Sequence, residues 1–381
     1  MKFRKRPEIL ALCLGNALGF MTSGAIPLWV DAEIKGGSLM ATWVGWLASG
    51  ELFAMAVGVL CLSVWRAPPK RTAIIASIGA IAANLIATLT MPWTLALGRI
   101  ASGLALGAVL SSVNRVAARR PDAQRVLSLM QAGMVVLVSV AFLAGPALIA
   151  RFSVSGLFGL YAAISAFMVL AAFGLPDRVQ GDAAYPAAQG QNRFALQAVV
   201  ACIALGIAFL GHNDLWAYIV TIGKGLGIEA HALGTALALV PPLAMLGPIA
   251  AHRLGNRAGL LPPLIVALAI YIADAFVLIR AENVIVFCMT ASVINIVMLF
   301  ITPYSIALIG RLDPTGRFAG AAPAFMMIGG SIGPAVGSRL VGAGRFNPLA
   351  LVASVSIAVS MTLFALARSK APTQDLRPRE H

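Results

Sequence analysis

Long apolar segments, separated by short polar or Gly/Pro-containing stretches, make up most of this chain. A helix needs about 20 apolar residues to cross the hydrocarbon core of a bilayer, and each segment reaches that length. The predicted spans cover residues 8–30, 39–64, 72–91, 93–115, 126–149, 154–174, 195–222, 231–250, 259–279, 283–309, 317–341 and 347–367. Only 11% of the 381 residues are charged, against about 25% in soluble domains. The chain is therefore predicted to be an all-α polytopic membrane protein.

One long polar segment, residues 176–194, interrupts the apolar pattern after the sixth span. We predict that it is a cytoplasmic linker between two six-helix bundles. The N-terminal bundle would cover residues 1–175, and the C-terminal bundle, with a short cytoplasmic tail, residues 195–381. Each half carries a Gly-Pro pair in its fifth span, at Gly145-Pro146 and Gly333-Pro334. Membrane proteins that are built from repeated bundles leave such traces of internal symmetry.

The basic residues gather in alternate connections between the spans. One side carries the N-terminal cluster and Arg66, Lys70, Arg71, Arg115, Arg119, Arg120, Arg125, Arg178, Arg193, Arg253, Arg257, Arg311, Arg317, Arg368, Lys370, Arg377 and Arg379. The other side carries Lys35, Arg151, Lys224, Arg280, Arg339 and Arg345. The positive-inside rule then predicts an even number of spans and both termini in the cytoplasm. We also expect a multi-pass protein of the inner membrane. The net charge of +14 is thus a topology signal and not a sign of nucleic-acid binding.

Two motifs resemble those of the major facilitator superfamily. The fourth span begins with residues 97–107, LGRIASGLALG, which contain an intramembrane Arg99 followed by small residues. The loop after the eighth span has the family's conformational motif at Gly247, His252, Arg253, Gly255 and Arg257, with His252 in place of the usual Asp. The equivalent loop of the first half, residues 58–71, has no acidic residue.

The resemblance extends from about residue 8 to residue 368, and it is closest in size and layout to the 12-helix drug and sugar efflux type. It implies two six-helix bundles, transport by alternating access, a small-molecule substrate, contact with membrane lipid, and action as a monomer. The small-residue ladders Gly103/Gly107 and Gly329/Gly333/Gly337 are expected to let helix backbones approach closely.

Few ionisable residues lie inside the predicted spans, and such residues are costly in hydrocarbon, so they are the first functional candidates. Glu51 of the second span is a candidate proton-coupling residue, because a proton carrier needs a carboxyl that can bind and release a proton. Its alternative role is a structural salt bridge. Arg99 offers five N–H donors, either to an anionic group of the substrate or to a carboxylate such as Glu51. We expect Arg99 to contribute to substrate binding.

The triplet His212-Asn213-Asp214 places three polar side chains in the seventh span. A His beside an Asp is a plausible proton relay, so His212 and Asp214 join the proton-coupling candidates. The alternative is that the triplet lies near the outer end and meets headgroup water. Three asparagines are candidates for substrate binding or, alternatively, for hydrogen bonds between helices: Asn16, Asn213 and Asn295. Asp274 of the ninth span is expected to be structural or interfacial.

Motifs of soluble catalysis do not fit this chain. It has no Walker loop, no dinucleotide fingerprint and no HExxH, and the GGSIG segment at residues 329–333 lies in an apolar helix instead of a strand-to-helix turn. We therefore expect no enzyme activity, no cofactor and no metal. The predicted function is proton-coupled secondary transport of a small organic solute, with export preferred. The alternatives are uptake of a small organic anion held by Arg99 and His212, and, more distantly, a sensor on a transporter scaffold.

Overall fold

The computed structural model describes residues 5–36, 39–65, 67–118, 120, 123–178, 195–255, 257–312, 317–341 and 346–369. Within these residues the chain forms helices and no strands. The helices are α1 (Lys5–Gly24), α2 (Ile26–Gly36), α3 (Ala41–Trp65), α4 (Pro69–Ala87), α5 (Pro92–Ala118), α6 (Ala123–Ala172), α7 (Ala195–Trp216), α8 (Ile219–Gly225), α9 (Ala230–Ala244), α10 (Leu246–Leu254), α11 (Leu261–Leu278), α12 (Val284–Leu312), α13 (Arg317–Ser338) and α14 (Asn347–Ser369). Most of the predicted linker, residues 179–194, and the tail after residue 369 lie outside the described part.

Some of these helices combine into single spans and one divides into two. The described residues contain ten apolar ranges long enough to cross a membrane, and α1 with α2 and α9 with α10 each form one of them. The range in α6 covers 44 residues and holds two spans, because the backbone breaks at Ser153, where φ is 58°. Adding α13, a 22-residue helix that contains Pro323 and Pro334, gives the twelve spans that the sequence predicts.

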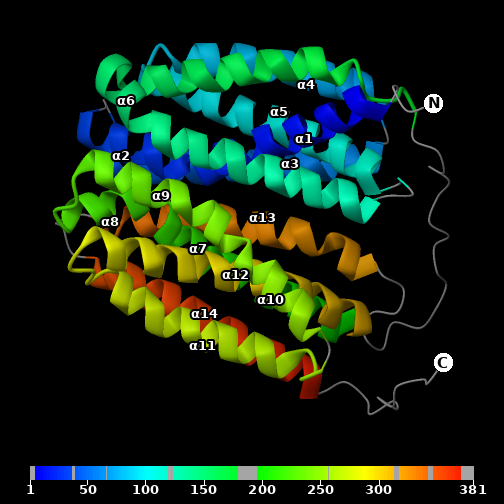
Figure 1. Cartoon of the computed structure of the whole chain (residues 1–381), viewed down its shortest axis with the longest axis vertical. Coiled ribbons are helices and arrows are strands. Elements are labelled where there is room, and N and C mark those ends of the chain that lie inside the picture. Colours follow the sequence, from blue (N-terminus) through cyan, green and yellow to red (C-terminus); the bar gives the residue numbers. More distant parts are fainter. Residues whose placement is uncertain are drawn as a thin grey trace.

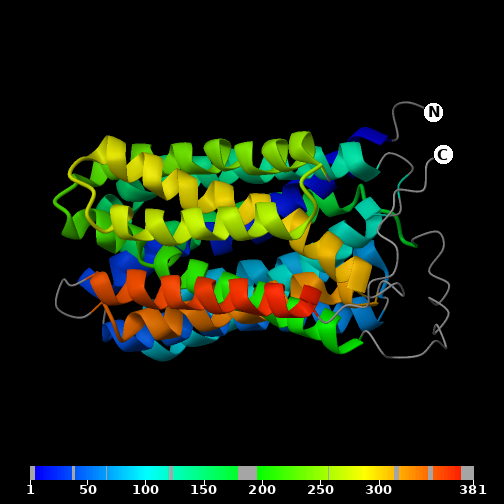
Figure 2. The ribbon, with the colours of Figure 1, turned by 90° about the horizontal axis from the view of Figure 1, so that it is seen from below.

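The helices run side by side in two groups (Figure 1). In this view α1–α6 occupy the upper part and α7–α14 the lower part, and the second view shows the same elongated bundle from below (Figure 2). Helix α1 begins and α14 ends at the same end of the bundle. We call this the inner end and the opposite one the outer end, after the predicted topology. The assignment of the inner end to the cytoplasm remains a prediction.

Many apolar side chains are exposed on the surface that surrounds the helix bundle, as is expected of a surface that faces lipid. Large apolar side chains are exposed on many helices, among them Trp43, Ile75, Trp93, Phe167, Leu170, Leu196 and Ile285. Helices can face lipid in this way because their backbone groups are bonded within the helix itself. The exposed apolar surface therefore fits a bilayer and not water.

Glycines set the spacing of the most closely packed helices. A Cβ on Gly103 would meet the carbonyl of Glu51, and one on Gly107 would meet the carbonyl of Met55, so α5 lies directly against α3. In the second group, Gly329 lies in the same way against the carbonyl of Gly206, which joins α13 to α7. The prediction that the small-residue ladders allow close backbone approach is confirmed.

Replacing Gly107 with Val is expected to destabilise the protein. The new side chain would meet backbone atoms of α3, which cannot rotate away, and overpacking of this kind costs about 1 to 3 kcal/mol or more. Thermal unfolding of the purified protein in detergent measures the effect. Gly79→Val is the matched control, because a Cβ on Gly79 meets only Ala105, at 3.9 Å. Equal unfolding temperatures for the two variants would contradict this account of the α3–α5 contact.

Candidate functional site

The first candidate site is a buried ion pair between α3 and α5. Arg99 is 0% exposed and Glu51 3% exposed. The Nε of Arg99 donates to Oε2 of Glu51 at 3.1 Å, and its second terminal nitrogen donates to Oε1, so the pair is bidentate. The close α3–α5 approach at Gly103, directly beside Glu51, brings the two side chains together. Of the two partners predicted for Arg99, the structure places Glu51 beside it.

Further polar and aromatic groups surround this pair. The other terminal nitrogen of Arg99 donates to Oδ1 of Asn84 on α4 at 2.8 Å, and Asn84 in turn donates to Ser102 at 3.2 Å. The guanidinium lies 4.9 Å from the ring centre of Phe158, and it also lies 5.7 Å from the rings of Trp29 and Tyr161. Such cation–π contacts stabilise a desolvated arginine. The Trp29 Nε1 and the Tyr161 hydroxyl are buried there without a hydrogen-bond partner among the described residues.

The second candidate site centres on Asp214 of α7. This side chain is 0% exposed, and neither carboxyl oxygen has a hydrogen-bond partner among the described residues. Its Oδ1 faces α13, where it would lie 2.7 Å from a Cβ on Gly337. Asp214 therefore differs from Glu51, whose carboxylate is fully paired.

His212 lies one turn from Trp216 in an aromatic enclosure. Its ring stacks on Trp216, with centroids 6.2 Å apart and planes at 12°, and Phe209 and Tyr271 approach it edge-on. The Nδ1 of His212 is 3.5 Å from the Tyr271 hydroxyl. His212 is thus buried against rings instead of meeting headgroup water.

The three predicted asparagines bond to backbone carbonyls. Asn16 donates to Met130 of α6 at 3.0 Å and so joins two helices. Asn213 donates to Phe209 at 3.0 Å and Asn295 to Ala291 at 2.8 Å, each within its own helix. The structure brings none of the three to the Arg99–Glu51 pair, and their part in substrate binding stays a prediction.

The glycines of the predicted conformational motif shape the inner end of α10. Gly247 lets α10 approach the backbone of α12 at Ile296. Gly255 ends α10 with φ at 53°, and its carbonyl accepts a hydrogen bond from Tyr304 at 2.8 Å. A positive φ favours glycine, because it has no Cβ to clash. His252, Arg253 and Arg257 are exposed beside this turn.

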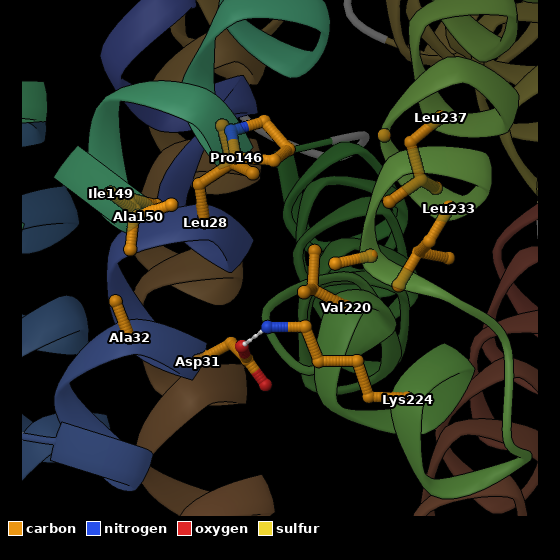
Figure 3. A pocket seen from close by; sticks show the side chains of 12 residues that line it. Leu28, Asp31, Ala32, Pro146, Ile149, Ala150, Val220, Lys224, Leu233 and Leu237 are labelled. Atoms are coloured by element: carbon orange, nitrogen blue, oxygen red, sulfur yellow. Dashed lines mark hydrogen bonds and ion pairs between the residues drawn. The ribbon is translucent and has the colours of Figure 1, made fainter.

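A contact that the sequence did not predict joins the two helix groups at the outer end. Asp31 of α2 accepts from Lys224 of α8 at 2.5 Å and from Thr221 of the same helix at 3.2 Å. Asp31 is 1% exposed, and Lys35 approaches it at 3.9 Å from one turn away. Figure 3 shows the Asp31–Lys224 bond at one side of a cavity of about 250 Å³.

This cavity lies between the two groups. Leu28, Pro146 and Ile149 line it from α2 and α6, and Leu233 and Leu237 face them from α9 (Figure 3). Three more contacts between the groups lie toward the outer end. They are a hydrogen bond from Trp216 to the Gly24 carbonyl at 3.0 Å, one from the Ala335 amide to Ser49 at 2.8 Å, and the packing of Gly234 on Phe142 and Pro146.

Among the described residues, no three His, Cys, Asp or Glu side chains gather in a way that would hold a metal ion. Two helix groups that contact each other toward the outer end and hold buried charged residues in their spans are typical of multi-pass membrane transporters. Residues 9–322 match the family model described as Major Facilitator Superfamily. The chain belongs to this family, and it is a transporter and not an enzyme.

Solved structures share the fold at low sequence identity. A D-xylose–proton symporter is 11% identical over 94% of this chain and 96% of its own, with a TM-score of 0.76. The nucleoside transporter NupG is 15% identical over 95% and 98%, with a TM-score of 0.75. A bacterial homolog of the human lysosomal transporter Spinster, in an inward-facing and occupied conformation, is 14% identical over 99% and 100%, with a TM-score of 0.72. A search of curated protein sequences finds no match.

Proposed function

We propose that this protein is a proton-coupled secondary transporter that exports a small organic solute across the inner membrane by alternating access. The observation that carries the coupling is the buried carboxyl of Asp214, which has no hydrogen-bond partner among the described residues. A charge at such a position costs at least about 2.5 to 3.5 kcal/mol on insertion scales, so we expect the carboxyl to be neutral in this state. When the helix groups move and water reaches Asp214, the proton can leave. Proton binding then biases the conformational equilibrium.

The contacts at the outer end support alternating access. They join α2 to α8 and α3 to α13, and they must break when the outer end opens. Asp31 would then lose Lys224 and Thr221 but keep Lys35, one turn away on its own helix. A cation thus stays beside the carboxylate in both states, which limits the cost of opening. The match to a structure described as inward-facing supports the same assignment for this state.

The geometry of Arg99 favours a neutral or cationic substrate over an anion. Three of its N–H groups are bonded to Glu51 and Asn84, and the side chain is 0% exposed. An anion would have to displace a bidentate carboxylate to reach it. The support for export is the resemblance in length and layout to the efflux type, together with the Gly145-Pro146 pair of the fifth span.

Proteoliposomes with a pH-sensitive dye inside test this function. The probes are ethidium as a cationic drug, D-xylose as a neutral sugar and lactate as an organic acid. We expect one of the first two to move across the membrane and to drive proton movement in the opposite direction. Transport of a probe without proton movement would contradict the coupling, and co-transport of protons with lactate would favour anion uptake instead.

A further inference from the structure

A groove runs along the contact between α3 and α13, where the two helix groups meet. Its volume is about 630 Å³. Trp46, Gly50 and Phe53 of α3 form one wall, and Ile332 and Val336 of α13 form the other. At about 1.5 Å per helical residue, the wall from Trp46 to Phe53 is about 10 Å long, and it runs from the outer end toward the middle of the span. The groove can therefore hold a stretch of hydrocarbon chain.

The groove opens toward the bilayer. Trp46, Phe53 and Ile332 are each about half exposed. Val352 of α14 forms one edge of the groove, and α14 packs on α7 and α11 at the edge of the bundle (Figure 1). Large apolar side chains exposed on the outside of a membrane-spanning bundle contact lipid. The ligand best placed to enter this groove is therefore a component of the membrane.

The two serine hydroxyls in the groove are already bonded within the protein. Ser49 accepts a hydrogen bond from the Ala335 amide at 2.8 Å, and Ser331 donates to the Ile328 carbonyl at 2.7 Å. Both serines are buried. Below its outer end the groove thus offers a ligand mainly apolar contacts, which suit an acyl chain better than a polar solute that would lose its hydrogen bonds to water.

Arg339 places a positive charge at the outer end of this groove. It follows directly after α13, its side chain is exposed, and its guanidinium lies 5.7 Å from the ring centre of Trp46 on α3. Among the described residues, no carboxylate lies within salt-bridge distance of Arg339. Trp and Arg side chains anchor spans at the headgroup level, and a guanidinium can bind a phosphate through two N–H groups. The groove thus has a cation at its mouth and apolar walls below it.

We propose that this groove binds one phospholipid with an anionic headgroup from the leaflet at the outer end. The phosphate accepts hydrogen bonds from Arg339, and one acyl chain lies against Trp46, Phe53 and Ile332. A zwitterionic lipid such as phosphatidylcholine carries the same phosphate, but its quaternary ammonium would add a second cation beside Arg339, so the charge favours the anionic lipid. The bound lipid contacts both helix groups, because the two walls belong to α3 and α13. This site is independent of the substrate and of proton coupling.

Native mass spectrometry of the purified full chain tests the site with phosphatidylglycerol and phosphatidylcholine that carry identical acyl chains. The unmodified protein should bind one phosphatidylglycerol at least fivefold more tightly than phosphatidylcholine. Arg339→Gln should remove this preference by weakening the binding of phosphatidylglycerol. Binding of phosphatidylcholine should change by less than twofold, because its headgroup has no net charge. Arg339 is exposed, so the variant is expected to fold.

Arg280→Gln is the matched control for the charge. Arg280 is also exposed at the outer end and lies over an aromatic ring, 6.0 Å from the centre of Phe276, but it does not line the groove. This variant should keep the preference for phosphatidylglycerol. Equal losses in the two arginine variants would overturn the inference, because they would show only a general attraction of the anionic lipid to the outer surface. An unchanged preference in Arg339→Gln would overturn it as well.

Ile332→Trp tests the apolar part of the site with Arg339 in place. The larger side chain would fill part of the groove, so binding of phosphatidylglycerol should fall at least threefold. Ile285→Trp, at an exposed position of α12 outside the groove, should leave binding unchanged. Unchanged binding in Ile332→Trp would overturn the inference. A mass of two chains without bound lipid would also overturn it and assign the groove to a second copy of the protein.

Discussion

Replacing Glu51 with Gln is expected to destabilise the protein by about 3 to 5 kcal/mol, because it leaves the buried guanidinium of Arg99 without its counter-charge. The arginine is 0% exposed and is enclosed by Phe158, Trp29 and Tyr161, so water cannot replace the carboxylate. Thermal unfolding in detergent should show a much lower midpoint. Glu282→Gln removes an exposed carboxylate between α11 and α12 and should have no measurable effect.

The double variant Glu51→Gln/Arg99→Gln completes this test. It leaves no unpaired charge, so it should be more stable than Glu51→Gln alone, and the two single effects should not add. Additive effects would contradict the direct pairing. Arg99→Lys provides a separate check, because a lysine cannot make the bidentate pair and should also destabilise the fold. If the Arg99→Lys protein is stable but has lost substrate binding, the result would favour the alternative in which Arg99 binds an anionic group of the substrate.

Replacing Asp214 with Asn is expected to abolish proton-driven transport while leaving the fold intact. The carboxyl has no hydrogen-bond partner among the described residues, so the amide loses no bond, but it cannot exchange a proton. In proteoliposomes, gradient-driven movement of the active probe should fall more than tenfold and counterflow should continue. Glu51→Gln is thus expected to destabilise the fold, because Glu51 is paired with the buried Arg99. Asp214→Asn is expected to impair coupling alone, because Asp214 has no hydrogen-bond partner among the described residues.

Glu229→Gln is the control for Asp214→Asn, since Glu229 is an exposed carboxylate at the start of α9 whose side chain forms no cap hydrogen bond. It should retain coupled transport. If coupled transport persists in Asp214→Asn, the coupled proton binds to Glu51 or to another carboxyl instead of Asp214. Loss of both coupled transport and counterflow would instead indicate that Asp214 is needed for the fold or for substrate binding.

The sequence was sufficient for the fold, because apolar length and the placement of basic residues are local signals. The count of twelve spans, the family and the close approach at Gly103 and Gly107 could all be read from it. The pairing of Glu51 with Arg99 was one of two expected roles. Asn84 was missed, although a single Asn in the apolar span at 72–91 is the same signal that drew attention to Asn16.

The outer-end contact was missed for a physical reason. The predicted first span ended at residue 30 and so left Asp31 outside it, whereas α2 continues to Gly36 and buries Asp31. Its partner Lys224 is 193 residues away, and only the packing of α2 on α8 brings the two together. The Tyr271–His212 contact likewise depends on how α11 lies against α7. No local pattern encodes such pairs.

The most direct test of alternating access is a set of distances between spin labels on the two helix groups. Labels at Gly36, where a side chain meets nothing within 4 Å, and at Glu229 report on the outer end, and labels at Arg71 and Arg253 report on the inner end. The native Cys13, Cys61, Cys202 and Cys288 are replaced first. We expect Asp31→Asn to add a population in which the outer distance is longer and the inner distance shorter. Distances that stay fixed at both ends, or that lengthen together, would contradict transport by alternating access.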